Sequence, residues 1–246
     1  MIYVCSDIHG QYDRFSKLLD ELKFSDEDTL YILGDVIDRG VDGIEILKYI
    51  MKHKTNIHLF MGNHEAFMLD YLKKFHMLGK KSEKNIWFSP NNGGDVTYEK
   101  FLLEDNKTQF DIIRFLEGLP YIQLLEVNGK KYHLSHSGTI FDVTDKDIWY
   151  GTDLSNSQRN NIVWSSCFNF EGSTTYSSYP EGYYAIVGHV AVQRIRNEFD
   201  YTIFRDKNII AIDGGCCYRS LEAEHEEVKC ALACICLDND KEFYVQ

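Results

Sequence analysis

Residues 29–40 read TLYILGDVIDRG, a mostly apolar run that stops at Gly34-Asp35-Val36-Ile37-Asp38-Arg39-Gly40. The run 29–33 is short, β-branched and aromatic, which predicts a buried strand. Its two aspartates and one arginine follow where the strand gives way to a loop. Open α/β sheets bind ligands at the carboxyl ends of their strands. We therefore expect a binding site at this point.

Two further units repeat this arrangement on either side. The run Ile2–Cys5 precedes Asp7-Ile8-His9-Gly10, and the run 57–61 precedes Gly62-Asn63-His64-Glu65. Helical spacing of apolar residues follows each unit, over Tyr12–Leu22, 44–53 and 66–77. This βαβαβα pattern predicts an α/β fold with parallel strands and helices packed outside them.

The second half of the chain changes character. Asn128-Gly129 between the apolar runs 121–127 and 131–135 is a strong hairpin signal. Further strands are expected over 184–187, 202–204, 209–212, 231–237 and 242–245. We expect one domain over 1–246, with a helical insertion at about 70–118 (helices over 96–103 and 109–116) and an irregular loop at about 151–183.

Composition narrows the classes of function. The 246 residues carry a formal net charge of −12, which argues against a nucleic-acid partner and against binding to anionic membranes. No apolar run approaches the roughly 20 residues of a membrane span. The chain opens directly into a strand rather than a signal peptide, so we expect a cytoplasmic protein. Seven cysteines, an odd number, fit a reducing compartment; we expect Cys216-Cys217 to pack in a loop.

The polar residues at the strand ends form a ligand set for two cations. Asp7 and His9 are two apart, so an extended chain points both side chains the same way. Asp35 has two oxygens and can bridge both ions. Asn63, His136 and His189 complete the second site, because the two late histidines also end strands. Ligation by Asp, His and Asn without thiolates favours Mn²⁺, Fe or Zn²⁺.

Such a centre suits the hydrolysis of a phosphate ester. A pair of ions clamps the attacking and leaving oxygens and makes hydroxide available at neutral pH, so attack on phosphorus is direct. We expect His64 to protonate the leaving group, with Asp38 orienting it. Arg39 presents a fork of donors to phosphate oxygens, and Asn63 lies beside the substrate as well as the metal.

These motifs resemble the PPP family of metallophosphatases, which includes serine/threonine protein phosphatases, phage-type phosphatases and bacterial diadenosine tetraphosphate hydrolases. The pattern Asp-x-His-Gly, Gly-Asp-x-x-Asp-Arg-Gly, Gly-Asn-His-Glu is matched at every fixed position, and Ser135-His136-Ser137-Gly138 and Ile212-Asp213-Gly214-Gly215 resemble later family motifs. The resemblance implies a four-layer αββα sandwich of two mixed β-sheets flanked by helices. It also implies a centre usually supplied with Mn²⁺ in bacterial members.

Two features bear on the substrate. Asp38 and Glu65 are both present, whereas the tetraphosphate hydrolases that this chain resembles typically lack them, so the resemblance favours a phosphoprotein phosphatase. Against this, Trp164 is followed by Ser165 and Ser166, where the compact phosphatases usually carry a second phosphate-binding arginine. Arg159, Arg194 and Arg219 are candidates to replace it.

Three functions stay open at this stage. The first is hydrolysis of phosphoserine, phosphothreonine or phosphotyrosine in proteins, or of a small phosphorylated substrate. The second is hydrolysis of dinucleoside polyphosphates, and the third is recognition of phosphorylated partners with little catalysis. The remaining histidines are expected on helix surfaces and outward strand faces; they are His53, His58, His76, His133 and His225.

Overall fold

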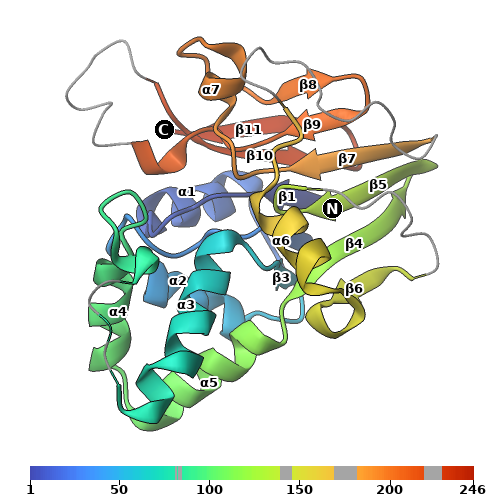
Figure 1. Ribbon diagram of the computed structural model, residues 1–246. Helices are drawn as coiled ribbons and strands as arrows, with labels where there is room; N and C mark the ends of the chain where they lie inside the picture. The colour runs from blue at the N-terminus through green and yellow to red at the C-terminus, as the bar shows by residue number, and fades with distance from the viewer. Residues whose placement is uncertain (81, 83–84, 139–145, 169–181, 219–228) are drawn as a thin grey trace.

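Two β-sheets packed face to face, with helices on both outer sides, form the four layers of the molecule (Figure 1). The computed structural model describes residues 1–80, 82, 85–138, 146–168, 182–218 and 229–246. The predicted αββα architecture is confirmed.

The first sheet has the strand order β11-β10-β1-β2-β3. Its strands are β1 (Ile2–Cys5), β2 (Thr29–Ile32), β3 (Ile57–Leu59), β10 (Leu232–Cys236) and β11 (Glu242–Val245). The three N-terminal strands are parallel, as the sequence predicts, and β10 joins β1 antiparallel. The carboxyl ends of β1, β2 and β3 therefore meet at one edge of the sheet.

The second sheet has the order β6-β4-β5-β7-β9-β8. Its strands are β4 (Pro120–Val127), β5 (Lys130–Ser135), β6 (Ile148–Tyr150), β7 (Tyr183–Val187), β8 (Phe204–Asp206) and β9 (Ile209–Ala211). The expected hairpin is β4–β5, while β5, β7 and β9 run parallel. Parallel pairing of β5 with β7 brings residues 136 and 189, which follow these strands, close together.

Helices cover the outer faces. On the first sheet lie α1 (Tyr12–Leu22), α2 (Gly43–Lys52), α3 (Asn63–Lys74), α4 (Gly94–Leu103) and α5 (Asn106–Glu117) (Figure 1). On the second, α7 (Val192–Arg196) packs its buried Val192 and Ile195 with Ile209 and Ala211 of β9. Buried residues of both sheets, including Val4, Leu134 and Ile186, fill the layer between them.

Several predicted bounds differ from the structure, and two of the differences have a clear local cause. Helix α3 begins at Asn63 rather than 66, because Glu65 turns back to accept the N–H of Gly62 at 3.1 Å. The expected irregular loop 151–183 contains α6 (Asn156–Trp164), which begins with a capping box between Ser155 and Gln158. Residues 169–181 of that loop lie outside the described residues.

His133 also departs from its prediction. We expect it on an outward strand face, but only 4% of the residue is exposed. Its strand β5 is central in the second sheet and is covered on both faces, so residues 132–135 are all buried.

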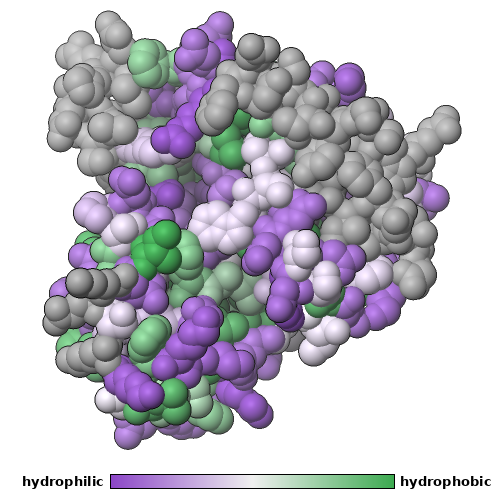
Figure 2. Space-filling model, in the orientation of Figure 1, coloured by the Kyte–Doolittle hydropathy of each residue, from purple (hydrophilic) through white to green (hydrophobic). Residues whose placement is uncertain are grey.

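Hydrophobic side chains that stay exposed gather over the helices of residues 63–117, at the lower left of the face that Figure 2 shows. They include Met77, Leu78, Ile86, Leu102, Leu103 and Phe110. None of the helices in the described ranges is both long and apolar enough to cross a membrane.

Candidate active site

Five loops converge where β1, β2, β3, β5 and β7 end. Backbone hydrogen bonds tie the first two loops together, from His9 N to Asp35 O at 2.9 Å and from Gly10 N to Val36 O at 2.8 Å. Gly10 and Gly40 touch so closely that a Cβ on Gly10 would lie 2.5 Å from the backbone of Gly40. Small residues thus let the loops approach and bring their side chains together.

Six residues of these loops have a left-handed backbone that side chains rarely adopt. They are Asp7, His9, Asp35, Asp38, Arg39 and His189, with φ between 47° and 70°. Each such conformation costs on the order of 1–3 kcal/mol and persists only where the surroundings impose it. All six belong to the set that the sequence singles out, so strain is concentrated where the functional side chains are.

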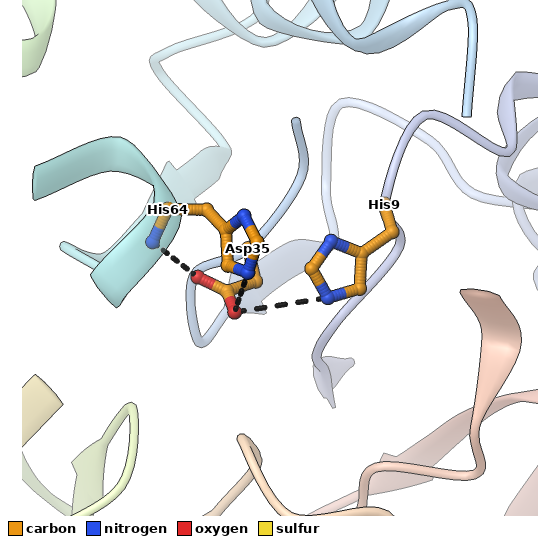
Figure 3. Close-up of side chains that lie close together, drawn as sticks. All are labelled: His9, Asp35 and His64. Carbon is orange, nitrogen blue, oxygen red and sulfur yellow. Dashed lines mark hydrogen bonds and ion pairs between the residues drawn. The ribbon is translucent and has the colours of Figure 1, made fainter. Parts of the chain in front are cut away.

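Asp35 lies at the centre of the cluster (Figure 3). Its Oδ2 is 3.7 Å from His9 Nε2, 3.9 Å from His64 Nε2 and 3.5 Å from His136 Nε2. Its Oδ1 accepts the backbone N–H of His64 at 3.0 Å. One carboxylate therefore faces imidazoles from both halves of the chain, the position that a bridging ligand needs.

Asn63 joins the two late histidines. Its Oδ1 is 2.9 Å from His136 Nε2 and 3.0 Å from His189 Nδ1. Asp7 lies beside them, because its Oδ2 accepts the backbone N–H of His189 at 3.0 Å. The structure thus brings together every residue that the sequence assigns to the site.

Backbone carbonyls fix the orientation of two imidazoles. His9 Nδ1 is 2.9 Å from Ile37 O, and His136 Nδ1 is 2.6 Å from Leu33 O. A carbonyl only accepts, so each Nδ1 donates and each Nε2 is left unprotonated on the side that faces the cluster. This is the tautomer that a metal ligand requires.

Burial and the charges of neighbouring side chains shift the pKa values of the histidines and of Asp35 in this cluster. Burial, and secondarily the charge of His136, lowers the pKa of His189 to about 3. Burial also lowers the pKa of His9 and His136. The burial of Asp35 alone would raise its pKa, but the histidines around it hold the pKa below the ordinary value. Neutral imidazoles and an ionised carboxylate are the protonation states that bind cations.

Two more carboxylates lie close by. Burial, followed by repulsion from Asp213 and Asp35, raises the pKa of Asp7 well above its usual range. Burial raises the pKa of Asp213 to about 6. Buried acids this close together are stable as anions only with a compensating cation. The donor set therefore fits divalent metal ions, with His9, Asp35 and His64 forming one group of potential ligands and Asp35, His136 and His189 another.

His64 makes a hydrogen-bonded pair with Asp38. His64 Nδ1 is 2.7 Å from Asp38 Oδ2, and both side chains are almost wholly buried. Burial would lower the pKa of His64, but the charges of Asp35 and Asp38 raise it above its ordinary value. The pairing with Asp38 therefore favours the protonated imidazole, and Nε2 faces the site, as a general acid requires.

The insertion supports this pair. Trp87 donates its indole N–H to Asp38 Oδ2 at 2.8 Å, and Thr97 Oγ1 accepts the backbone N–H of Asp38 at 2.9 Å. Sequence reasoning missed both contacts; the short spacing of Trp87 from Asn92-Gly93-Gly94 was the available signal. The Arg39 backbone N–H also reaches Gly93 O, at 3.3 Å.

Arg39 lies across the mouth of the cluster. Its Nη1 is 2.5 Å from His9 Nε2, and its Nη2 is 3.2 Å from His64 Nε2. Nη1 also donates to Cys217 Sγ at 3.3 Å. Cys217 lies in the short 3-10 helix Cys216–Tyr218 and not in an irregular loop as expected, and its thiol contacts a site residue, which sequence reasoning did not foresee.

Glu65 stabilises the backbone of the loop that follows β2. Its carboxylate accepts the backbone N–H groups of Asp35 at 2.7 Å and Val36 at 2.9 Å, in addition to that of Gly62. Sequence reasoning used Glu65 only to judge the substrate. The structure gives it a supporting role for the backbone that carries Asp35.

The three candidates for a second phosphate-binding arginine differ in their position and in their partners. Arg159 is engaged elsewhere, with Nη1 on Gly151 O at 2.8 Å and Nη2 on Asn156. Arg194 lies near enough to Asp213 that its charge partly opposes the rise in pKa that burial causes there. Arg219 is outside the described residues. Trp164 packs edge-on against Phe67, at 4.9 Å between ring centroids, and against His189 at 6.0 Å.

Comparison with known proteins agrees with this geometry. Residues 1–206 match the calcineurin-like phosphoesterase family, and the chain belongs to that family. It is similar to serine/threonine-protein phosphatase 2 of Salmonella typhimurium, with 30% identity over 168 residues and 67% of each protein covered. The chain is therefore a metal-dependent phosphoesterase.

Other similar proteins are named for a different substrate class. The symmetrical bis(5'-nucleosyl)-tetraphosphatase of Buchnera aphidicola is 42% identical over 68 residues, 27% of this chain and 25% of that protein. The crystal structure of a candidate diadenosine tetraphosphatase has a TM-score of 0.62 at 16% identity, over 99% of this chain and 92% of that one. The latter likeness is one of fold.

Proposed function

We propose that this chain hydrolyses phosphomonoesters, with phosphoserine and phosphothreonine in proteins as substrates, and that residues 1–246 form one such domain. The observation that carries this proposal is the buried His64–Asp38 pair, 2.7 Å apart beside Asp35. Release of an alkoxide from serine or threonine needs a proton donor because the leaving group is poor. A protein that only bound phosphorylated partners would have no use for this pair.

The metal assignment follows the donor set. Asp7, His9 and Asp35 would hold one divalent ion, and Asp35, Asn63, His136 and His189 the other, with Mn²⁺ as the proposed metal and Fe or Zn²⁺ as alternatives. Such ions neutralise phosphoryl charge and make bound water acidic. His64 Nε2 also lies close enough to Asp35 to act as a ligand, so metal content is a direct test of its role.

The roles of the chain's own side chains follow from their positions. Arg39 is placed to receive phosphate oxygens, because its guanidinium spans the Nε2 atoms of His9 and His64. His64 would then protonate the leaving oxygen, and Asp38 holds its Nδ1 so that Nε2 faces that oxygen. The half-exposed Trp164 beside His189 limits solvent access on one side.

Hydrolysis of dinucleoside polyphosphates is the second candidate. It is favoured by the similarity to symmetrical tetraphosphatases and by the absence of an arginine directly after Trp164. A nucleotide is a better leaving group than serine, so that reaction has less need of the His64–Asp38 pair.

A substrate panel separates the candidates. Metal-free protein is titrated with Mn²⁺ and assayed on p-nitrophenyl phosphate, a phosphoserine peptide and diadenosine tetraphosphate. We expect metal-dependent turnover and a kcat/KM for the peptide at least about tenfold above that for the dinucleotide. The reverse order would overturn the protein-phosphatase proposal in favour of the second candidate. Saturable metal binding without turnover of any substrate would reject both.

A further inference from the structure

A cavity of about 460 Å³ lies where the end strand β3 of the first sheet and the end strand β6 of the second both contribute to its lining. From the first sheet it is lined by Tyr31 on β2 and His58 on β3, and from the second by Gln123 on β4 and Tyr150 on β6. None of the residues assigned to the phosphoesterase site lines it. Its volume lies within the range of about 300–1,000 Å³ typical of sites for small molecules.

Aromatic rings form its walls. Tyr31 stacks on His58 with 5.3 Å between ring centroids and 29° between planes, and Phe60 packs edge-on against Tyr31 at 6.1 Å. Tyr150 on the other sheet is 43% exposed and Ile148 is 37% exposed. Flat, apolar walls of this kind favour a planar ring as ligand.

Two cations complete the lining. Lys54 and Arg114 both contribute, while no aspartate or glutamate does, although the chain has 38 acidic residues against 26 basic ones. Within the described residues neither cation makes an ion pair; the Arg114 guanidinium lies over the ring of Phe110, 5.5 Å from the ring centroid. Charge complementarity therefore calls for an anionic group on the ligand.

Polar atoms are also available to the edge of a ring. In the described ranges, neither the Tyr31 hydroxyl nor the His58 imidazole has a hydrogen-bond partner, and Gln123 uses only its Nε2, on Leu124 O. Burial lowers the pKa of His58, so the neutral imidazole offers one donor and one acceptor. A purely hydrocarbon ring would leave these groups unused.

We propose that this cavity binds a nucleoside monophosphate, with the base against the rings of Tyr31 and Tyr150 and the phosphate against Lys54 and Arg114. Addition of a peptide strand to β3 fits less well, because Ile57 and Leu59 are only 1% and 2% exposed and their backbone is covered. The site is independent of the proposed phosphatase activity.

Calorimetric titration of metal-free protein with AMP tests the proposal. Wild-type protein should bind one AMP saturably. Adenosine alone and inorganic phosphate alone should each bind with an affinity at least about tenfold lower than that for AMP. The double variant Lys54→Gln/Arg114→Gln should lose about tenfold or more in affinity. The matched control is Lys107→Gln/Lys146→Gln, which removes the same charge from cations that already have partners, Asp111 and Asp153. Its affinity should stay within about twofold of wild type.

A second variant guards against a folding defect. Tyr150→Ala removes one ring without changing charge and should also weaken AMP binding, with an unchanged thermal unfolding midpoint. Absence of saturable AMP binding up to about 5 mM would overturn the proposal. So would equal binding by wild type and both cavity variants, since AMP would then bind elsewhere. Inorganic phosphate binding as tightly as AMP would show an anion site without recognition of the base, and would also overturn it.

Discussion

The indole N–H of Trp87 donates to Asp38 Oδ2 at 2.8 Å, on the same oxygen that faces His64. A residue of the helical insertion thereby fixes the carboxylate that orients the proposed general acid. The segment that we expect to be an insertion therefore contributes a side chain to the candidate site.

Replacing Trp87 with Phe removes this hydrogen bond and keeps most of the packing. A hydrogen bond of about 1–1.5 kcal/mol corresponds to about a tenfold fall in kcat on a phosphoserine peptide, with little change in KM. Trp149→Phe is the control, because the Trp149 indole nitrogen has no partner among the described residues. Equal kcat values for the two variants would remove Trp87 from the positioning role.

Replacing His64 with Asn tests the general acid. We expect kcat on a phosphoserine peptide to fall about 10²–10⁴-fold, and turnover of p-nitrophenyl phosphate to fall much less, since its leaving group needs less protonation. Metal content measured by plasma mass spectrometry should stay at the wild-type value. Loss of an ion would instead make His64 a ligand.

Replacing Asp35 with Asn tests the bridging carboxylate. The amide has one oxygen and no charge, so at least one of the two ions should be lost, and activity with it. Metal content is again the measurement. Asp111→Asn, on an exposed helix face where Asp111 pairs with Lys107, should bind metal as the wild type does. An unchanged metal content in the Asp35 variant would refute the bridging role.

Replacing Arg39 with Lys keeps a positive charge but loses the forked geometry. We expect KM for the peptide, and Ki for inorganic phosphate, to rise about tenfold. Arg159→Lys serves as the control because its guanidinium is held by Gly151 and Asn156. If Arg39→Lys leaves both constants unchanged, another cation binds the phosphate.

The lowered pKa of the buried His133 predicts that the free energy of unfolding depends on pH. Burial lowers the pKa of His133 to about 4 from an ordinary 6.5, so the folded protein binds this proton less readily than the unfolded chain. The unfolding free energy is therefore not reduced by His133 above pH 6.5. As the pH falls towards 4, protonation of His133 in the unfolded chain lowers the unfolding free energy by about 3 kcal/mol in total. In the metal-free protein, His133→Leu should reduce the acid-induced loss of unfolding free energy by about that amount, measured by denaturant titration at several pH values. An identical pH dependence in both proteins would contradict this.

The residues of the site could be predicted because each follows a strand whose pattern is local. Asp35, Asn63 and His136 each come directly after an apolar run, and parallel pairing then makes them neighbours. Trp87 and Cys217 could not be predicted in the same way. Their contacts with Asp38 and Arg39 depend on how segments 49 and 178 residues away dock, which no periodicity records.

The errors in the fold have similar causes. Helix α6 was not predicted because its sequence is mostly polar. Only Ile162 and Val163 are buried, so the apolar residues do not show a clear helical spacing. For His133 the assumption that one strand face meets solvent was wrong, because β5 is enclosed by neighbouring strands and by both adjoining layers.

Pairing of β10 with β1 places residues 232–236 against residues 2–5 at the middle of the first sheet. During synthesis on the ribosome, β1 emerges before β10, and the side of β1 that pairs with β10 stays unpaired until the chain passes residue 236. That open edge can pair with another chain in the meantime. The β1–β2–β3 unit is therefore open to pairing with a wrong strand until β10 has been made and docks beside β1.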